Sequence, residues 1–94
     1  MSDLVTQAAA VLAQKIPSFD GMAKFVFKGH GALMLGPDGV RVADEAADVT
    51  LTAEAEVFKA ILDGSMNPTM AFMTGKLSVD GSMGLAMKLG SVLS

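Results

Sequence analysis

The sequence contains no cysteine, no tryptophan and no tyrosine, and one histidine among 94 residues. Without thiols, and with a single imidazole, the chain offers neither a disulfide framework nor a structural zinc site, so we expect no metal and no cofactor. No stretch approaches the ~18 consecutive apolar residues that a membrane-spanning helix requires. The first residues lack the basic start and apolar run of a secretion signal. We therefore expect a cytoplasmic protein.

Positive charge is also scarce. The formal net charge is −3, and the seven lysine and arginine residues are scattered along the chain. Nucleic-acid binding proteins usually present a basic stripe together with stacking aromatic side chains. Five phenylalanines are the only aromatic residues of this chain. We expect no nucleic-acid partner.

Apolar residues are abundant instead. They make up 51% of the chain, and ten further residues are glycine, whereas the two groups together reach about 45–50% in ordinary domains. One domain spanning residues 1–94 has little interior relative to its surface. The surplus must therefore be buried in a partner or membrane, face an internal cavity, or be spread among small alanines.

The first half of the chain predicts a helix followed by strands. Ser2 or Asp3 can cap a helix that runs to about Lys15 and is stopped by Pro17. Short β-branched and aromatic runs separated by glycine turns then predict four strands, at 24–28, 32–35, 40–42 and 48–52. The tight turns favour an antiparallel meander of these four strands.

The second half predicts three helices and a fifth strand. Thr52 is expected to cap a helix that ends at Gly64, and Asn67 a short helix that runs to Thr74. Pro68 suits the first position of this short helix. Its apolar side chains point almost all the way round, so we expect it to be buried. A strand at 76–79 precedes a last helix, capped by Ser82.

The last helix has an unusually wide apolar face. At ~100° per residue, apolar residues and Gly90 fill a continuous arc of about 220°, whereas a helix that lies on a sheet needs roughly 100–160°. Met83 and Met87 form one edge of the arc. This helix has more apolar surface than one packing partner covers.

The reactive groups are few. His30 stands between two glycines in a predicted turn, and no motif supplies it with a nucleophile or an orienting partner. The carboxylates Asp44, Glu45 and Asp48 fit a solvated loop better than a cation site. We therefore predict no catalytic residue and no enzymatic activity.

Methionine is the positive feature. Five of the eight methionines lie close together in the sequence: Met66, Met70, Met73, Met83 and Met87. Methionine is flexible and recurs on surfaces that accept varied apolar partners. These residues either pack an ordinary core or line a deformable apolar pocket, and the residues alone leave both interpretations open.

An ordered series of residues over about half the chain resembles the sterol carrier protein 2 family of non-specific lipid-transfer proteins. It begins with the run from Ala47 to Thr52 and a helix that carries Phe58 and Leu62. It continues with these residues: Gly64, Asn67-Pro68, Ala71-Phe72, Gly75-Lys76-Leu77, Gly81 and Leu85-Ala86-Met87-Lys88-Leu89. The compact chain is most similar to the prokaryotic members. It ends in Val92-Leu93-Ser94 and not in the Ser-Lys-Leu address of many eukaryotic relatives.

The resemblance implies an α+β fold, with a five-stranded, mostly antiparallel sheet covered by helices. It also implies an apolar tunnel between the sheet and the C-terminal helices, which would bind a fatty acid, acyl-coenzyme A, a phospholipid or a sterol-like lipid. The residues at matching places are Phe58, Leu62, Met66, Met70, Phe72, Met73, Met83 and Met87. The expected function is lipid binding and transport, with a transient membrane contact.

An alternative interpretation is a protein–protein interaction module. In this case the Met-rich apolar surface would mediate oligomerisation or dock a partner chain. The sequence leaves the oligomeric state and the identity of the ligand open.

Overall fold

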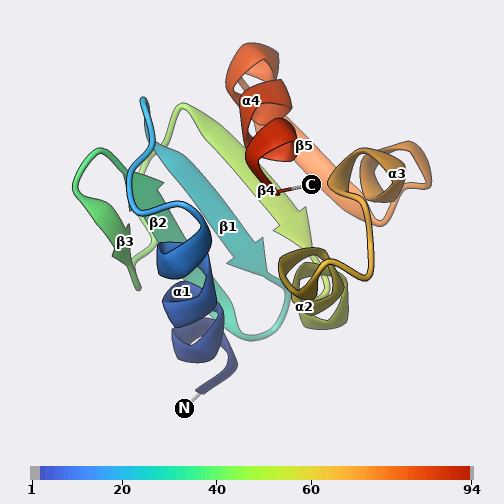
Figure 1. The fold of residues 1–94 in the computed structure, drawn as a ribbon, viewed down its shortest axis with the longest axis horizontal. Coiled ribbons are helices and arrows are strands. Elements are labelled where there is room, and N and C mark those ends of the chain that lie inside the picture. The colour runs from blue at the N-terminus through green and yellow to red at the C-terminus, as the bar shows by residue number, and fades with distance from the viewer. Residues whose placement is uncertain (1–2, 94) are drawn as a thin grey trace.

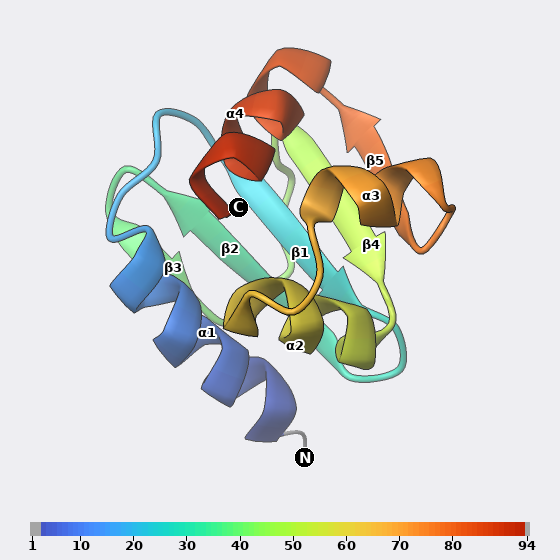
Figure 2. The same ribbon diagram turned by 45° about the vertical axis from the view of Figure 1, so that its right-hand side comes forward.

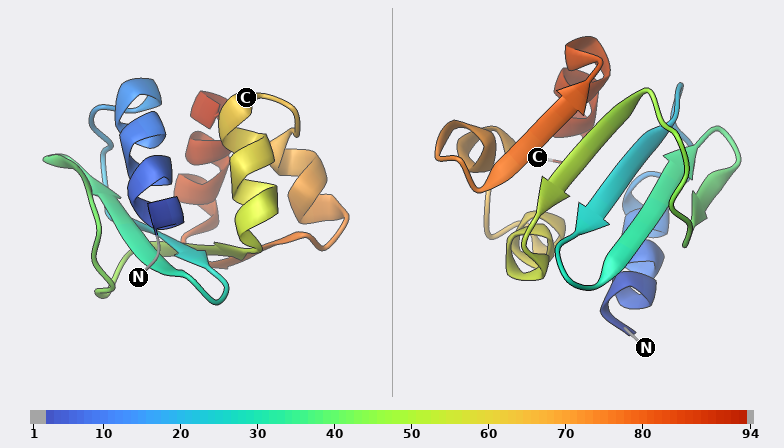
Figure 3. Two further views of the ribbon diagram at one scale, coloured as in Figure 1. Left: turned by 90° about the horizontal axis from the view of Figure 1, so that it is seen from below. Right: turned by 180° about the vertical axis from the view of Figure 1, so that it is seen from behind.

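The computed structural model describes residues 3–93 and has an α+β fold, in which a five-stranded sheet is covered by helices. Figures 1 and 3 show the helices gathered on one face of the sheet. In chain order the elements are α1 (Asp3–Lys15), β1 (Ala23–Phe27), β2 (Gly31–Gly36), β3 (Gly39–Arg41), β4 (Val49–Ala53), α2 (Ala55–Asp63), α3 (Pro68–Met73), β5 (Leu77–Gly81) and α4 (Met83–Leu93). The fold class expected from the resemblance is confirmed.

The strand order is β3-β2-β1-β4-β5, and every neighbouring pair is antiparallel except β1 and β4, which are parallel. The predicted four-strand meander is therefore wrong at its fourth strand. β4 lies beside β1, on the side away from β3. Local turn signals predict which strands are consecutive hairpins, but not which edge of the sheet a later strand joins.

The chain reaches β4 by crossing to the other side of β1. Figure 3 shows this connection passing over the face of the sheet that the helices leave open. Two ion pairs bind it to the strands, one between Lys24 Nζ and Asp44 Oδ1 at 2.9 Å and one between Arg41 and Glu45. Asp44 and Glu45 thus lie in an exposed loop, as expected, and pair there with side chains of two strands.

Alternate strand residues form the core. In β1 and β4 the buried residues are Ala23, Phe25, Phe27, Val49, Leu51 and Ala53, which confirms that Val49 and Leu51 point inward. Because partners in register share a face, these positions lie side by side beneath the helices. The period-two pattern thus gives the sheet one apolar face, and the helices cover that face.

α1 packs over β2 and β3 and beside α2 through the predicted face. Val5, Leu12 and Ile16 are buried, and the helix ends at Lys15, two residues before the proline that stops it. Ser2 lies outside the described residues, and Asp3 already belongs to the helix. The amphipathic pattern was sufficient to predict this element.

The start of α2 differs from the prediction. Thr52 is not its cap, because β4 continues through Ala53 and Thr52 pairs with Val26 on one side and Ser78 on the other. Glu54 takes the cap position, without a capping bond from its side chain. Two neighbouring strands therefore hold the backbone of Thr52 extended. The end of the helix at Gly64, which adopts a φ of 87°, is as predicted.

The start of α3 is as predicted, but its burial is not. The Asn67 side chain accepts hydrogen bonds from the backbone nitrogens of Thr69, at 2.8 Å, and Met70, at 3.3 Å. Only Pro68 and Ala71 of this helix are buried. Its apolar side chains extend all round, but neighbouring elements cover one side only, so the expectation of a fully buried helix is wrong.

Gly81 at the end of β5 provides a test of this fold. It has a φ of 101°, and a Cβ atom there would collide with the backbone carbonyl of Asp48. We predict that Gly81→Ala lowers the free energy of unfolding by about 1–3 kcal/mol. Gly84, on the exposed side of α4, has room for a Cβ. Gly84→Ala should therefore raise the unfolding free energy by about 0.5–1 kcal/mol. Denaturant titration measures both, and equal effects would contradict the register of β4 and β5.

Candidate functional site

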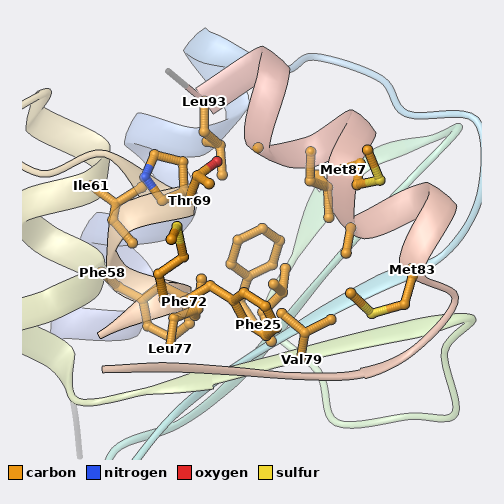
Figure 4. A pocket seen from close by; sticks show the side chains of 16 residues that line it. Phe25, Phe58, Ile61, Thr69, Phe72, Leu77, Val79, Met83, Met87 and Leu93 are labelled. Atoms are coloured by element: carbon orange, nitrogen blue, oxygen red, sulfur yellow. The ribbon is translucent and has the colours of Figure 1, made fainter. Parts of the chain in front are cut away.

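A cavity of about 310 Å³ opens between the inner face of the sheet and the helices α2, α3 and α4. Figure 4 shows side chains from all of these elements converging on it. Phe25, Leu51, Leu77 and Val79 line it from the strands. The helical lining residues are Phe58, Ile61, Pro68, Thr69, Phe72, Met73, Met83, Ala86, Met87, Leu89, Gly90 and Leu93.

The lining is almost entirely hydrocarbon and thioether. Thr69 contributes the only polar side chain, and no charged residue lines the cavity. Water needs two to four polar partners to be held in a cavity, so this one holds water poorly. Apolar small-molecule sites usually measure about 300–1,000 Å³. The volume lies at the lower end of that range.

α4 forms one wall of the cavity. Its apolar arc is wide enough to face the core on one side and the cavity on the other. Leu89 and Leu93 are buried toward the core, whereas Met83 and Met87 are 49% and 73% exposed. Figure 4 shows both methionine side chains along the cavity beside α4. The surplus apolar surface expected from the sequence is therefore real, and no other described element covers it.

Two contacts fasten the same helix to the chain before β1. Lys88 Nζ forms an ion pair with Asp20 Oδ2 at 2.9 Å and lies 5.8 Å from the centre of the Phe19 ring. At the start of the helix, the Ser82 hydroxyl accepts a hydrogen bond from the backbone nitrogen of Leu85, as the predicted cap requires. The Lys88 contacts therefore link one side of α4 to the segment before β1, and the Ser82 bond caps the start of the helix.

The structure brings together five of the eight residues predicted to bind a ligand. Phe58, Phe72, Met73, Met83 and Met87 line the cavity. The other three lie elsewhere: Leu62 faces a second cavity across α2, Met66 is half-buried against the core, and Met70 is 56% exposed outside both cavities. Contact of any of the eight with a ligand stays a prediction.

Several lining residues were not predicted as site residues. Phe25, Leu51, Leu77 and Val79 come from three strands, and period-two alternation identifies such residues only as inward-facing. Ile61 belongs to the predicted apolar face of its helix, one residue before Leu62. Sequence patterns indicate which residues are buried, but the arrangement of helices decides which of them border a gap.

Three phenylalanine rings meet at one end of the cavity. The Phe58 ring of α2 lies 5.6 Å from the ring of Phe25 and 4.5 Å from that of Phe27, centre to centre, in tilted arrangements. All three side chains are buried. Aromatic pairs in such geometries contribute about 0.5–1.5 kcal/mol beyond the area they bury. The cluster ties α2 to β1.

The polar groups that could carry chemistry lie outside the cavity. His30 is exposed in the turn between β1 and β2, where its backbone nitrogen donates to the carbonyl of Phe27. Within residues 3–93, no three histidine, cysteine or acidic side chains are grouped closely enough to hold a metal ion. No helix in this part of the chain has the length and hydropathy to cross a membrane.

A sequence model described as the SCP-2 sterol transfer family matches residues 1–94. Hydroxysteroid dehydrogenase-like protein 2 of Xenopus tropicalis is 35% identical over 88 residues, which cover 85% of this chain and 21% of that protein. Sterol carrier protein 2 of Homo sapiens is 51% identical over 47 residues, or 50% of this chain and 9% of that protein. The chain thus spans about a fifth, or less, of the length of these relatives.

Solved structures share the fold. The solution structure of sterol carrier protein 2 from Aedes aegypti, in complex with the C16 fatty acid palmitate, superposes with a TM-score of 0.78 and 23% identity. The match covers 100% of this chain and 97% of that one. At this identity the likeness concerns the fold alone.

The exposure of the cavity rim generates a prediction about stability. Met73 and Met87 are each 73% exposed, so we predict that Met73→Gln and Met87→Gln change the free energy of unfolding by no more than about 0.5 kcal/mol. Leu89, on the same helix as Met87, is fully buried. Leu89→Ala should cost about 2–5 kcal/mol. Thermal or denaturant unfolding gives both values. A large loss for the Met87 variant would mean that its side chain packs in the core.

Proposed function

This chain belongs to the SCP-2 sterol transfer family, and we propose that it binds and carries the hydrocarbon chain of a lipid in the cavity beside α4. One observation carries the proposal: sixteen residues from the sheet and three helices line an open cavity in which Thr69 supplies the only polar side chain. Such a lining offers a lipid chain a place out of water without asking for a specific polar partner.

Desolvation of the hydrocarbon would supply the affinity. Each buried methylene contributes about 0.8 kcal/mol, so ten would contribute roughly 8 kcal/mol. Association costs an estimated 4–15 kcal/mol, and this cost is smallest when the site is already formed. Leu77, Leu89 and Phe25 are buried and fixed by the core, while the methionines at the rim can adapt to the ligand. Because a preformed site keeps the association cost near the low end of this range, a few kcal/mol of net binding free energy remain without hydrogen bonds to the chain.

The chemistry of the lining favours a fatty acyl chain over other lipids. No charged side chain lines the cavity, so a carboxylate, phosphate or coenzyme A head group would remain in water at the mouth. The volume lies at the low end for small-molecule sites, which suits a flexible chain better than a rigid sterol ring system. The palmitate held by the related Aedes aegypti protein supports the same class.

The proposed role is transport and not catalysis. Every titratable group of the described chain lies outside the lining of this cavity. A bound acyl chain would therefore meet no acid, base or nucleophilic side chain. The chain would hold and release its ligand unchanged.

Substitution of the cavity methionines tests the proposal. We predict that Met83→Gln combined with Met87→Gln weakens binding of a fluorescent fatty acid about tenfold, because desolvating two amides opposes the gain from the hydrocarbon. Met70→Gln is the matched control, since Met70 is also exposed and lines neither cavity. Fluorescence titration of delipidated protein compares both variants with the unsubstituted protein. If the unsubstituted protein neither binds the probe nor retains lipid in native mass spectrometry, the proposal is wrong.

A second candidate function rests on the surface around the cavity mouth. Large exposed apolar side chains gather on α3 and α4: Met70, Phe72, Met73, Met83, Met87 and Val92. Figure 2 shows these two helices side by side at the C-terminal end of the fold. Such a surface also suits docking of a partner chain or of a second copy. In a lipid carrier, this exposed apolar surface would contact a membrane transiently while the lipid enters or leaves the cavity.

The two functions differ in solution behaviour. If the surface serves lipid uptake, we predict that light scattering finds the delipidated protein monomeric at every protein concentration at which it stays in solution. Addition of phospholipid vesicles should then speed the release of a bound fluorescent fatty acid. Met70→Gln, outside the cavity but on this surface, should slow vesicle-dependent release while leaving affinity unchanged. A concentration-dependent dimer that Met70→Gln dissociates would favour the interaction module instead.

A further inference from the structure

A second cavity of about 220 Å³ lies on the other side of α2, between α2 and α1. Its apolar walls are Leu4, Ala8, Val11, Phe27, Ala55 and Leu62, and its polar lining residues are Gln7, Lys59 and Asp63. The proposed site does not include this side of α2, although one residue on it, Leu62, was expected from the sequence to bind a ligand. Like the first cavity, it has apolar walls where it faces the core. Unlike the first cavity, it is also lined by charged side chains, those of Lys59 and Asp63.

The two cavities share a wall of aromatic rings. Phe25 lines the first cavity and Phe27 the second. They lie two residues apart on the inner face of β1. The Phe58 ring contacts both, at 5.6 and 4.5 Å between centres. Figure 4 shows Phe58 and Phe25 among the side chains that line the first cavity. The Phe58 ring therefore contacts one phenylalanine that lines the first cavity and one that lines the second.

We propose that the second cavity is the distal compartment for the end of a long acyl chain, and that Phe58 is the partition that sets the chain length accepted. This inference rests on the proposed function, because it assigns the far end of the same ligand. A chain that fills the first cavity reaches Phe58. A longer chain displaces the ring and continues beneath α2 along β1 into the second cavity.

The charged groups of the second cavity define where the compartment ends. Hydrogen bonds from Ser65 hold the pKa of Asp63 below its ordinary value, and Lys59 and Lys15 act in the same direction. Asp63 therefore stays ionised at neutral pH. A methyl terminus gains nothing by passing such a group. The compartment accepts the end of a chain between Phe27 and Leu62 and stops it before the charged residues.

The experiment compares affinities for saturated fatty acids of increasing length in a fluorescent displacement assay. In the unsubstituted protein, affinity should rise about fourfold per added methylene, level off over the lengths that must displace the Phe58 ring, and rise again for chains long enough to enter the second cavity. In Phe58→Leu, which keeps an apolar core residue, the rise should continue to longer chains. Phe19→Leu is the matched control: Phe19 is buried as well but lines neither cavity, so its profile should level off where the unsubstituted one does.

A second variant tests the compartment with Phe58 intact. Val11 lines the second cavity from α1 and is partly exposed, so Val11→Trp can fill this space with little disturbance of the core. It should weaken binding of the longest chains by tenfold or more and leave the short chains unaffected. Binding with the same length profile in all variants would overturn the proposal and leave the proposed function standing. Absence of fatty acid binding in the unsubstituted protein would overturn both.

Discussion

The parallel pairing of β1 with β4 at the centre of the sheet determines where every other element lies. It puts β4 and β5 on one side of β1 and the hairpin of β2 and β3 on the other. α2, which follows β4 directly, therefore returns across the inner face and places Phe58 over Phe25 and Phe27. α3 and α4 are left to cover the edge near β5. With β4 beside β3 instead, the two helices would stand over a different part of the sheet and this cavity would not exist.

The cavity exists because short helices cover this half of the sheet incompletely. α3 is six residues long, and only Pro68 and Ala71 of it are buried. α4 contacts the core through Leu89 and Leu93 and leaves the methionine edge of its arc exposed. A domain of 94 residues has little apolar surface to spare for stability, so an uncovered apolar edge on two adjacent helices points to a ligand that covers it.

The residue types on the two sides of the cavity fit a carrier. Fixed side chains such as Phe25, Leu77 and Leu89 form the side toward the core, and flexible methionines form the rim. A rigid floor keeps the site open in the absence of ligand, which lowers the cost of binding. An adaptable rim lets chains of different shape enter. In the proposed carrier, the aromatic partition at Phe58 would add a limit on chain length to a site that otherwise recognises hydrocarbon without discrimination.

The amino-acid sequence by itself determined the local elements and the chemical character of the site. Periodicity placed α1, the inward residues Val49 and Leu51, and the surplus apolar arc of α4; capping chemistry placed Asn67, Gly64 and Ser82. These properties depend on residues that are close together along the chain, so they can be predicted from the sequence pattern. For Met73, Met83 and Met87 the sequence left open whether they pack an ordinary core or line a deformable apolar pocket.

Only the tertiary structure decided how these elements share space. The partner of β4, the extended state of Thr52 and the exposed side of α3 all depend on contacts between segments far apart in the sequence. For the same reason, Leu62 and Phe58, four residues apart on one helix, line different cavities. A periodic pattern shows that a side chain is apolar and on which face of its element it lies. Which neighbour it meets, or which gap it borders, is decided when the elements pack.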